Sequence, residues 1–290
     1  MNVYFLFGIS SVLGALSTLL NKRFQQGFTP NTVNFVMYNF VNALFGTIAF
    51  AVMSGGSIQF NMPTFSYSFL YAIVVIGSIV SNILSLSCMS VALVVMTSTA
   101  GSIIFPSLFG IIFLKEELTV RLLISLILMI TATVIPHVEK SRFNLSFKKL
   151  FILFLLVFFT ALDVVTLKLY TRNPNVYSTQ SFFAITNIIL IAILGIVLIF
   201  IKKPENTSVF KSFTLRQTGN IALRTLFSNI ISVLTVVILT SMNISAYTVL
   251  SSTFGILSSA LLSKFYFKEH MPPVNWIALL IAILAVAVNP

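Results

Sequence analysis

The sequence has few charged residues for its length. Charged types make up 8% of the 290 residues, against roughly 25% in a soluble globular domain. Hydrophobic types reach 58%, and the mean hydropathy is +1.04. No charged residue occurs between Arg23 and Lys115. Because a soluble fold could not expose such a stretch to water and stay dispersed, the composition predicts a membrane protein.

Residues that build catalytic and metal centres are also scarce. Cys88 is the single cysteine, which excludes an intramolecular disulfide and a cysteine-based metal cluster. Both histidines, His137 and His270, fall in expected connectors, and no apolar stretch holds two carboxylates for metal or acid–base chemistry. The sequence has no Gly-x-Ser-x-Gly element and no phosphate-binding loop. We therefore expect no enzymatic activity, no cofactor and no metal.

Basic residues are the abundant charged type. Lys and Arg number 17 and Asp and Glu 6, giving a net charge of +11. The basic residues lie almost entirely between apolar blocks, where such residues hold helix ends at anionic headgroups. We therefore expect membrane lipids and a small-molecule substrate as partners, no nucleic acid, and a monomer as the working hypothesis. The expected location is the cell membrane, as a multi-pass protein.

Apolar runs separated by polar or Pro/Gly breaks predict ten membrane-spanning helices. They are expected at residues 3–21, 32–53, 65–87, 92–114, 118–136, 148–170, 178–201, 217–240, 244–266 and 274–289. Ten spans of about 20 residues use about 200 positions and leave short connectors, so no soluble domain fits. The first apolar block has no basic n-region, and we expect it to be retained as a helix.

Four sequence features recur in the same order in the two halves of the chain. The paired segments are 15–22 with 161–168, 81–85 with 228–232, and 114–117 with 267–270. A stripe with one small residue or helix modifier at every fourth position also recurs: Ser98, Ser102, Pro106 and Gly110 in the first copy, and Ser251, Gly255, Ser259 and Ser263 in the second. The recurrence indicates an internal repeat, with domains at 1–143 and 144–290.

Each half then holds five helices, and an odd number makes the second half enter the membrane in the opposite sense. The fold class expected is an all-α polytopic membrane protein with two inverted five-helix repeats. Two inverted halves can exchange inward-open and outward-open states. The substrate site is then expected near the midplane, between the halves.

Ten helices as five plus five, with the fourth ending in an acidic turn, resemble the drug/metabolite transporter superfamily and, more narrowly, EamA-type carriers. Residues 111–135 resemble the most recognisable part of that repeat, with Glu116 at the family's acidic position. Lys22 matches a basic position common there, whereas residues 264–288 resemble the repeat less well. The resemblance implies alternating access and a cavity lined by helices from both halves.

Ionisable groups inside a membrane span are costly and are functional candidates by default. Asp163 is the only acidic residue well inside an expected helix. It is either a proton site or counter-ion for a cationic substrate, or the structural partner of Arg224 in the eighth expected helix. Lys168 and Lys22 lie near helix ends, where we expect both side chains to extend to the membrane surface.

Amides within spans form a second group of candidates. Asn82 and Asn229 are equivalent under the repeat, and each can contact substrate or hydrogen-bond a neighbouring helix. Asn34, Asn39, Asn42 and Asn187 form a further polar set. Asn39 and Asn187 are kept as substrate-binding or coupling candidates, although helix packing is expected for most of this set.

The repeated stripes are expected to be close-packing surfaces, and Ser102, Gly110, Gly255 and Ser259 to form a hinge or packing contact. Glu116 and Glu269 are expected to fix helix hairpins at opposite membrane faces through a neighbouring Lys or Arg.

The function expected is a secondary transporter that moves a small polar metabolite or drug by alternating access. The alternative is a flippase of a lipid or lipid-linked sugar that uses the same inverted-repeat frame. A channel is disfavoured because no charged ring or carbonyl filter is apparent. Orientation stays open, since twelve connector Lys and Arg on one side against four on the other favour external termini, whereas the resemblance favours internal ones.

Overall fold

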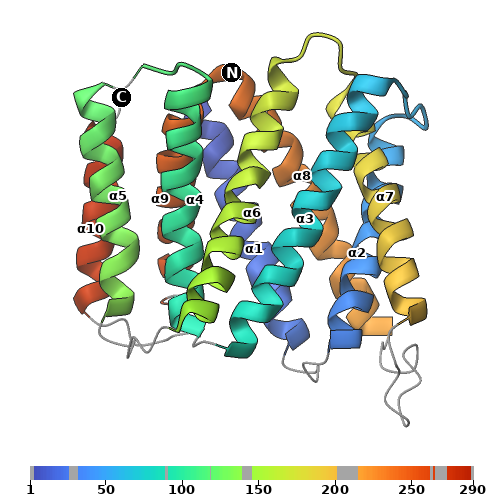
Figure 1. The fold of residues 1–290 in the computed structure, drawn as a ribbon, viewed down its shortest axis with the longest axis horizontal. Coiled ribbons are helices and arrows are strands. Elements are labelled where there is room, and N and C mark those ends of the chain that lie inside the picture. The colour runs from blue at the N-terminus through green and yellow to red at the C-terminus, as the bar shows by residue number, and fades with distance from the viewer. Residues whose placement is uncertain are drawn as a thin grey trace. The chain divides into compact units, whose positions relative to one another are not determined.

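The computed structural model describes residues 3–25, 32–88, 91–117, 119–138, 146–200, 215–261, 264 and 273–288, and its main elements there are ten α-helices (Figure 1). They are α1 (Val3–Gln25), α2 (Thr32–Met53), α3 (Met62–Cys88), α4 (Val91–Phe113), α5 (Val120–Val138), α6 (Phe147–Arg172), α7 (Thr179–Phe200), α8 (Leu215–Ser241), α9 (Ile244–Leu261) and α10 (Pro273–Val288). The predicted all-α architecture and the ten helices are confirmed.

Side chains at the helix starts explain why the elements begin where they do. Asn61 Oδ1 accepts a hydrogen bond from Thr64 N at 2.9 Å, and Thr119 Oγ1 accepts one from Leu122 N at 3.2 Å. Each residue precedes the first helical position and satisfies an N–H group that has no partner inside the helix. The polar breaks in the sequence therefore act as N-caps of α3 and α5.

Among the described residues, five helices contain segments long and apolar enough to cross a membrane. These segments are Val33–Met53, Met62–Ser85, Phe147–Arg172, Thr179–Phe200 and Gln217–Ser241. The other helices contribute shorter apolar segments, at Val3–Ser17, Ala100–Phe113, Val120–Ile135, Ile244–Ser258 and Pro273–Val288. Large apolar side chains are exposed on them, for example Leu280 and Leu284 on α10. Several long apolar helices indicate a multi-pass membrane protein, and the span assignment of the shorter ones stays a prediction.

The helices form two compact units, and each unit takes segments from both halves of the sequence. Unit 1 comprises Met1–Ser11, Ile73–Arg172 and Val237–Pro290. Unit 2 comprises Val12–Ala72 and Asn173–Val236. The chain passes from one unit to the other inside α1, α3 and α8 and also directly after α6. The compact units thus differ from the repeat boundary expected from sequence, and the repeat itself stays a prediction.

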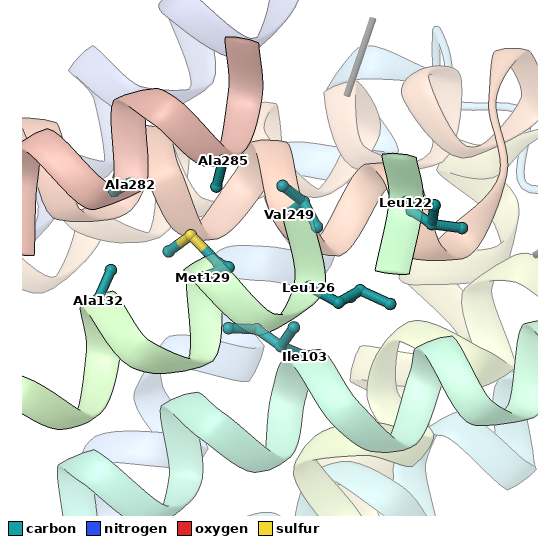
Figure 2. Packing of buried hydrophobic residues seen from close by; sticks show 8 residues of the cluster. All are labelled: Ile103, Leu122, Leu126, Met129, Ala132, Val249, Ala282 and Ala285. Carbon is teal, nitrogen blue, oxygen red and sulfur yellow. The ribbon is translucent and has the colours of Figure 1, made fainter. Parts of the chain in front are cut away.

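The core of unit 1 packs α4, α5, α9 and α10 together. Figure 2 shows its buried members, which are Ile103, Leu122, Leu126, Met129, Ala132, Val249, Ala282 and Ala285. Ala132 on α5 and Ala282 on α10 are almost fully buried, and small side chains let helices approach closely. The Thr253 hydroxyl lies 2.9 Å from Val249 O within α9, so its polarity is satisfied inside this apolar core.

The core of unit 2 joins α2, α7 and the start of α3 through aromatic rings. Phe50 stacks on Phe183 with ring centroids 5.1 Å apart. Tyr71 meets the rings of Phe182 and Phe183 at 5.4 and 5.9 Å. The Ser68 hydroxyl donates to Phe182 O at 3.0 Å, which ties α3 to α7. These contacts give unit 2 a rigid aromatic centre.

Candidate functional site

A buried carboxylate holds the N-terminus of α9 in unit 1. Glu116 is only 7% exposed. Its Oε1 accepts a hydrogen bond from Ile244 N at 2.8 Å. Its Oε2 accepts from Ser245 N at 3.3 Å and from Ser245 Oγ at 3.1 Å. The first N–H groups of a helix have no partner inside the helix and carry partial positive charge, so an anion is stabilised there.

The end of α4 directs Glu116 toward that position. Lys115 adopts a left-handed backbone conformation with φ of 54°, and Glu116 N donates to Gly110 O at 3.0 Å. The chain therefore folds back along α4 directly after the helix. A Cβ on Gly110 would clash with Ile244 Cγ2 and would lie 2.6 Å from Glu116 Oε2, so the contact requires glycine at this position.

A buried ammonium holds the C-terminus of the preceding helix. Lys168 on α6 is 6% exposed, and its Nζ donates to Leu239 O and to Met242 O, both at 2.6 Å. The expectation that this side chain extends to the membrane surface is therefore wrong. The last carbonyl groups of α8 have no partner inside the helix and carry partial negative charge, and this attracts the cation inward.

The two charges fix the turn between α8 and α9 from both sides. The Glu116 carboxylate attracts the Lys168 ammonium, which offsets part of the cost of burying that cation. Glu116 was expected to act through a neighbouring Lys or Arg, and its direct partners are instead the backbone and hydroxyl of α9. The polar atoms of both side chains are hydrogen-bonded to the end of α8 and the start of α9. The arrangement therefore has a structural role. We refer to Glu116 and Lys168 with this turn as the α8–α9 clamp.

A half-buried charge lies in unit 2 and has a different environment. The guanidinium carbon of Arg224 on α8 lies 5.2 Å from the centroid of the Tyr38 ring on α2. The Tyr38 ring also packs on Ile221 in a small buried cluster. Within the described residues of unit 2, the buried Nε of Arg224 has no hydrogen-bond partner. The ring holds the guanidinium by a cation–π contact and leaves its N–H donors for other groups.

Two further polar side chains, Thr225 and Asn42, lie near the cation–π contact. The Thr225 hydroxyl lies 2.6 Å from Asn42 Oδ1 and 2.7 Å from Ile221 O, so its single proton is shared between two acceptors. Asn42 and Tyr38 are four residues apart on α2 and share a helix face. With its Oδ1 engaged by Thr225, the amide of Asn42 has its N–H groups left to donate. We call Arg224, Tyr38, Asn42 and Thr225 the arginine cluster.

The predicted amide candidates fall in several different environments. Asn39 Nδ2 donates to Phe35 O at 2.8 Å within α2. The Asn187 side chain lies against Gly46, where an added Cβ would come 2.8 Å from Nδ2, so it packs α7 on α2. Asn229 is 7% exposed, and its Nδ2 has no hydrogen-bond partner in the described part of the chain. Asn82 is half-buried on α3.

Asp163 and Arg224, the two ionisable candidates, belong to different units. Asp163 lies on α6 in unit 1 and is half-buried, whereas Arg224 lies in unit 2. Their pairing and the coupling role of Asp163 stay predictions. The contact between Arg224 and Tyr38 was not predicted from the sequence, although an aromatic residue among the amides of α2 was a signal for a cation–π contact.

The small residues of the two repeated stripes differ in how closely other helices approach them. Gly110 is at a close contact, and the Ser107 hydroxyl lies 3.2 Å from Thr248 Oγ1, which joins α4 to α9. Ser102 is half-buried. At Gly255, an exposed position, a Cβ would meet no atom within 4 Å, so the expected close approach is not found there. The hinge role stays a prediction, and the side chains of Ser259, Glu269 and Lys22 lie outside the described residues.

Comparisons with known proteins support the fold alone. No family model matches the chain, and no curated protein matches its sequence. A solved crystal structure of a protein is similar to it with a TM-score of 0.72 and 14% sequence identity. The similarity covers 99% of this chain and 95% of the other. The ten-helix architecture is therefore one that a solved protein shares over nearly its whole length.

Proposed function

We propose that the protein is a secondary transporter that moves a small polar metabolite or drug across a membrane by alternating access, as a carrier of the drug/metabolite transporter type. The ten apolar helices and their similarity to a solved fold over 99% of the chain support this proposal. So does the resemblance of residues 111–135 to EamA-type carriers. The predicted inverted repeat supplies the two conformations that alternating access requires.

The observation that carries the proposal is Arg224. A guanidinium stays charged at physiological pH, and a permanent charge within an apolar helix is costly. Glu116 and Lys168 are accounted for by the helix ends that they hold. Among the described residues of unit 2, the guanidinium of Arg224 lies over the Tyr38 ring, and its buried Nε has no hydrogen-bond partner. A charge inside a span is a functional candidate by default, and Arg224 therefore favours contact with a transported molecule.

Reconstitution of the purified protein into liposomes tests the proposal. Labelled amino acids, amines, nucleosides and sugar phosphates are offered outside, with and without the same unlabelled compound inside. We expect saturable uptake of one class that the internal compound accelerates, because exchange through one alternating site has this signature. Protein-free liposomes and an Arg224→Gln variant are the controls. Lipid flipping without uptake of any water-soluble compound would instead support the flippase alternative.

A further inference from the structure

We propose that the arginine cluster in unit 2 binds an oxyanion, a carboxylate or phosphate group carried by the ligand. This inference rests on the proposed function, since it names the chemical class of the substrate of that carrier. It assigns the recognition of the anion to Arg224 and the positioning of its guanidinium to Tyr38.

The charge inventory of unit 2 is the first argument. Its sequence contains seven Lys and Arg, and its single acidic residue is Glu205, which lies outside the described residues. No protein carboxylate is therefore available to Arg224 among the described residues of its own unit. A guanidinium in an apolar helix needs a counter-charge, and a ligand anion supplies one.

The geometry of the guanidinium is the second argument. Its Nε is buried and has no hydrogen-bond partner within the described part of unit 2, and the face of the Tyr38 ring lies 5.2 Å from its central carbon. A ring that lies against the central carbon leaves N–H groups of the planar guanidinium for another acceptor. That planar fork matches two oxygens of one carboxylate or phosphate.

The neighbouring polar groups are the third argument. Thr225 follows Arg224 on α8, and its hydroxyl engages Asn42 Oδ1 at 2.6 Å. Fixing the amide oxygen in this way leaves the N–H donors of Asn42 for an acceptor. A cation and amide donors on facing helices favour an acceptor-rich ligand group, which an oxyanion is and an ammonium group is not.

The competing assignment makes the Asp163 carboxylate the counter-ion of Arg224. In that case a free oxyanion gains nothing from the guanidinium while Asp163 is present. The two assignments therefore differ in how the wild-type protein and an Asp163→Asn variant respond to added anions.

Ligand-dependent melting of the purified protein in detergent provides the test. Matched probes differ only in the oxyanion: glycerol 3-phosphate with glycerol, and lactate with lactamide. Lysophosphatidic acid with monoacylglycerol asks whether the anion comes from a lipid headgroup. A ligand that binds the native state raises its melting temperature by mass action. We expect at least one oxyanion, and none of its neutral analogues, to stabilise the wild-type protein.

Variants assign the response to Arg224. Arg224→Gln should weaken oxyanion binding about tenfold or more, as expected for the loss of charge-assisted hydrogen bonds. Arg121→Gln removes the same charge from an exposed position on α5 and should leave the affinity unchanged. If Arg224→Gln does not fold, Arg224→Lys keeps the charge, removes the planar fork and should still weaken binding.

Four results overturn the inference: no oxyanion stabilises the wild type, the neutral analogues stabilise it equally, the Arg224 variants respond like the wild type, or a response arises only in Asp163→Asn. Uptake assays separate this failure from failure of the proposed function. Transport of a neutral or cationic compound that survives Arg224→Gln would refute the anion site alone. Oxyanion binding through Arg224 without transport of any compound would refute the transporter function alone.

Discussion

Lys168 lies near a helix end, and its side chain was expected to reach the membrane surface. Its Nζ instead donates to two carbonyl groups at the end of α8. Lys168→Met keeps a long flexible chain and removes the three donors. Both carbonyls then lose their partner, and we expect a loss of about 2–4 kcal/mol in the free energy of unfolding. Denaturation in detergent measures it, with Lys148→Met at an exposed position of α6 as control. Equal stability of the two variants would contradict the clamp.

Glu116 and Glu117 are adjacent acidic residues with opposite environments, one buried and one exposed. Glu116→Gln preserves the shape but removes the negative charge and replaces one of the two acceptor oxygens by an NH2 group, which then faces the donors of either Ile244 or Ser245. We expect it to cost about 1–3 kcal/mol. Glu117→Gln should change stability by less than about 0.5 kcal/mol. Melting temperatures that fall equally in both variants would show that the cap contributes nothing.

At the scale of the element, the close contact between the end of α4 and the start of α9 depends on Gly110. Gly110→Ala places a Cβ against Ile244 and Glu116, and overpacking of this kind costs about 1–3 kcal/mol. Gly255→Ala is the matched control, because a Cβ there meets open space. Since alanine favours helix over glycine, we expect Gly255→Ala to be neutral or to stabilise by up to about 1 kcal/mol. Thermal unfolding of both variants tests the difference, and equal effects would contradict it.

The helices were predictable because apolar runs and polar breaks are local signals. The predicted span 32–53 coincides with α2, and 244–266 begins at the first residue of α9. The α8–α9 clamp was not predictable, because its partners come from the segment after α4, from α6 and from the turn before α9, far apart in sequence. A stripe pattern likewise could not show that Gly110 is in contact and Gly255 is not. Side-chain neighbours on other helices decide both cases.

At the scale of the whole molecule, the two units combine segments from both sequence halves, which a search for linkers or composition changes could not detect. The chain changes unit inside α1, α3 and α8 without a break in the helix. No loop or Pro/Gly-rich segment marks those positions. Single members of the site could be predicted from the sequence, but their contacts could not. The charge of Arg224 within a span marked it as a candidate, whereas its contact with a ring on α2 required the structure.

The orientation of the chain gives a further prediction at this scale. The count of basic residues favoured external termini, and the burial of Lys168 removes one of the four residues that opposed it. Ten spans also place both termini on one side. We expect tags at both ends to be labelled by a membrane-impermeant reagent in intact cells. A tag labelled at one end only would contradict ten spans, and two internal tags would contradict the charge count.

At the same scale, the proposed transport is the property that we expect Asp163 to govern. This residue is a half-buried acid on a long apolar helix, and its counterpart in the predicted repeat is Ser17, so internal symmetry does not require the charge. Asp163→Asn keeps the volume and removes both the charge and the titratable proton. We expect uptake into liposomes to fall at least about tenfold, or to lose its dependence on a proton gradient, while melting stays near the wild type. Asp163→Glu restores the carboxylate and should recover part of the uptake, which a purely steric role would not allow. Native uptake and a native pH profile in Asp163→Asn would exclude coupling through this residue and leave Asp163 as a structural partner.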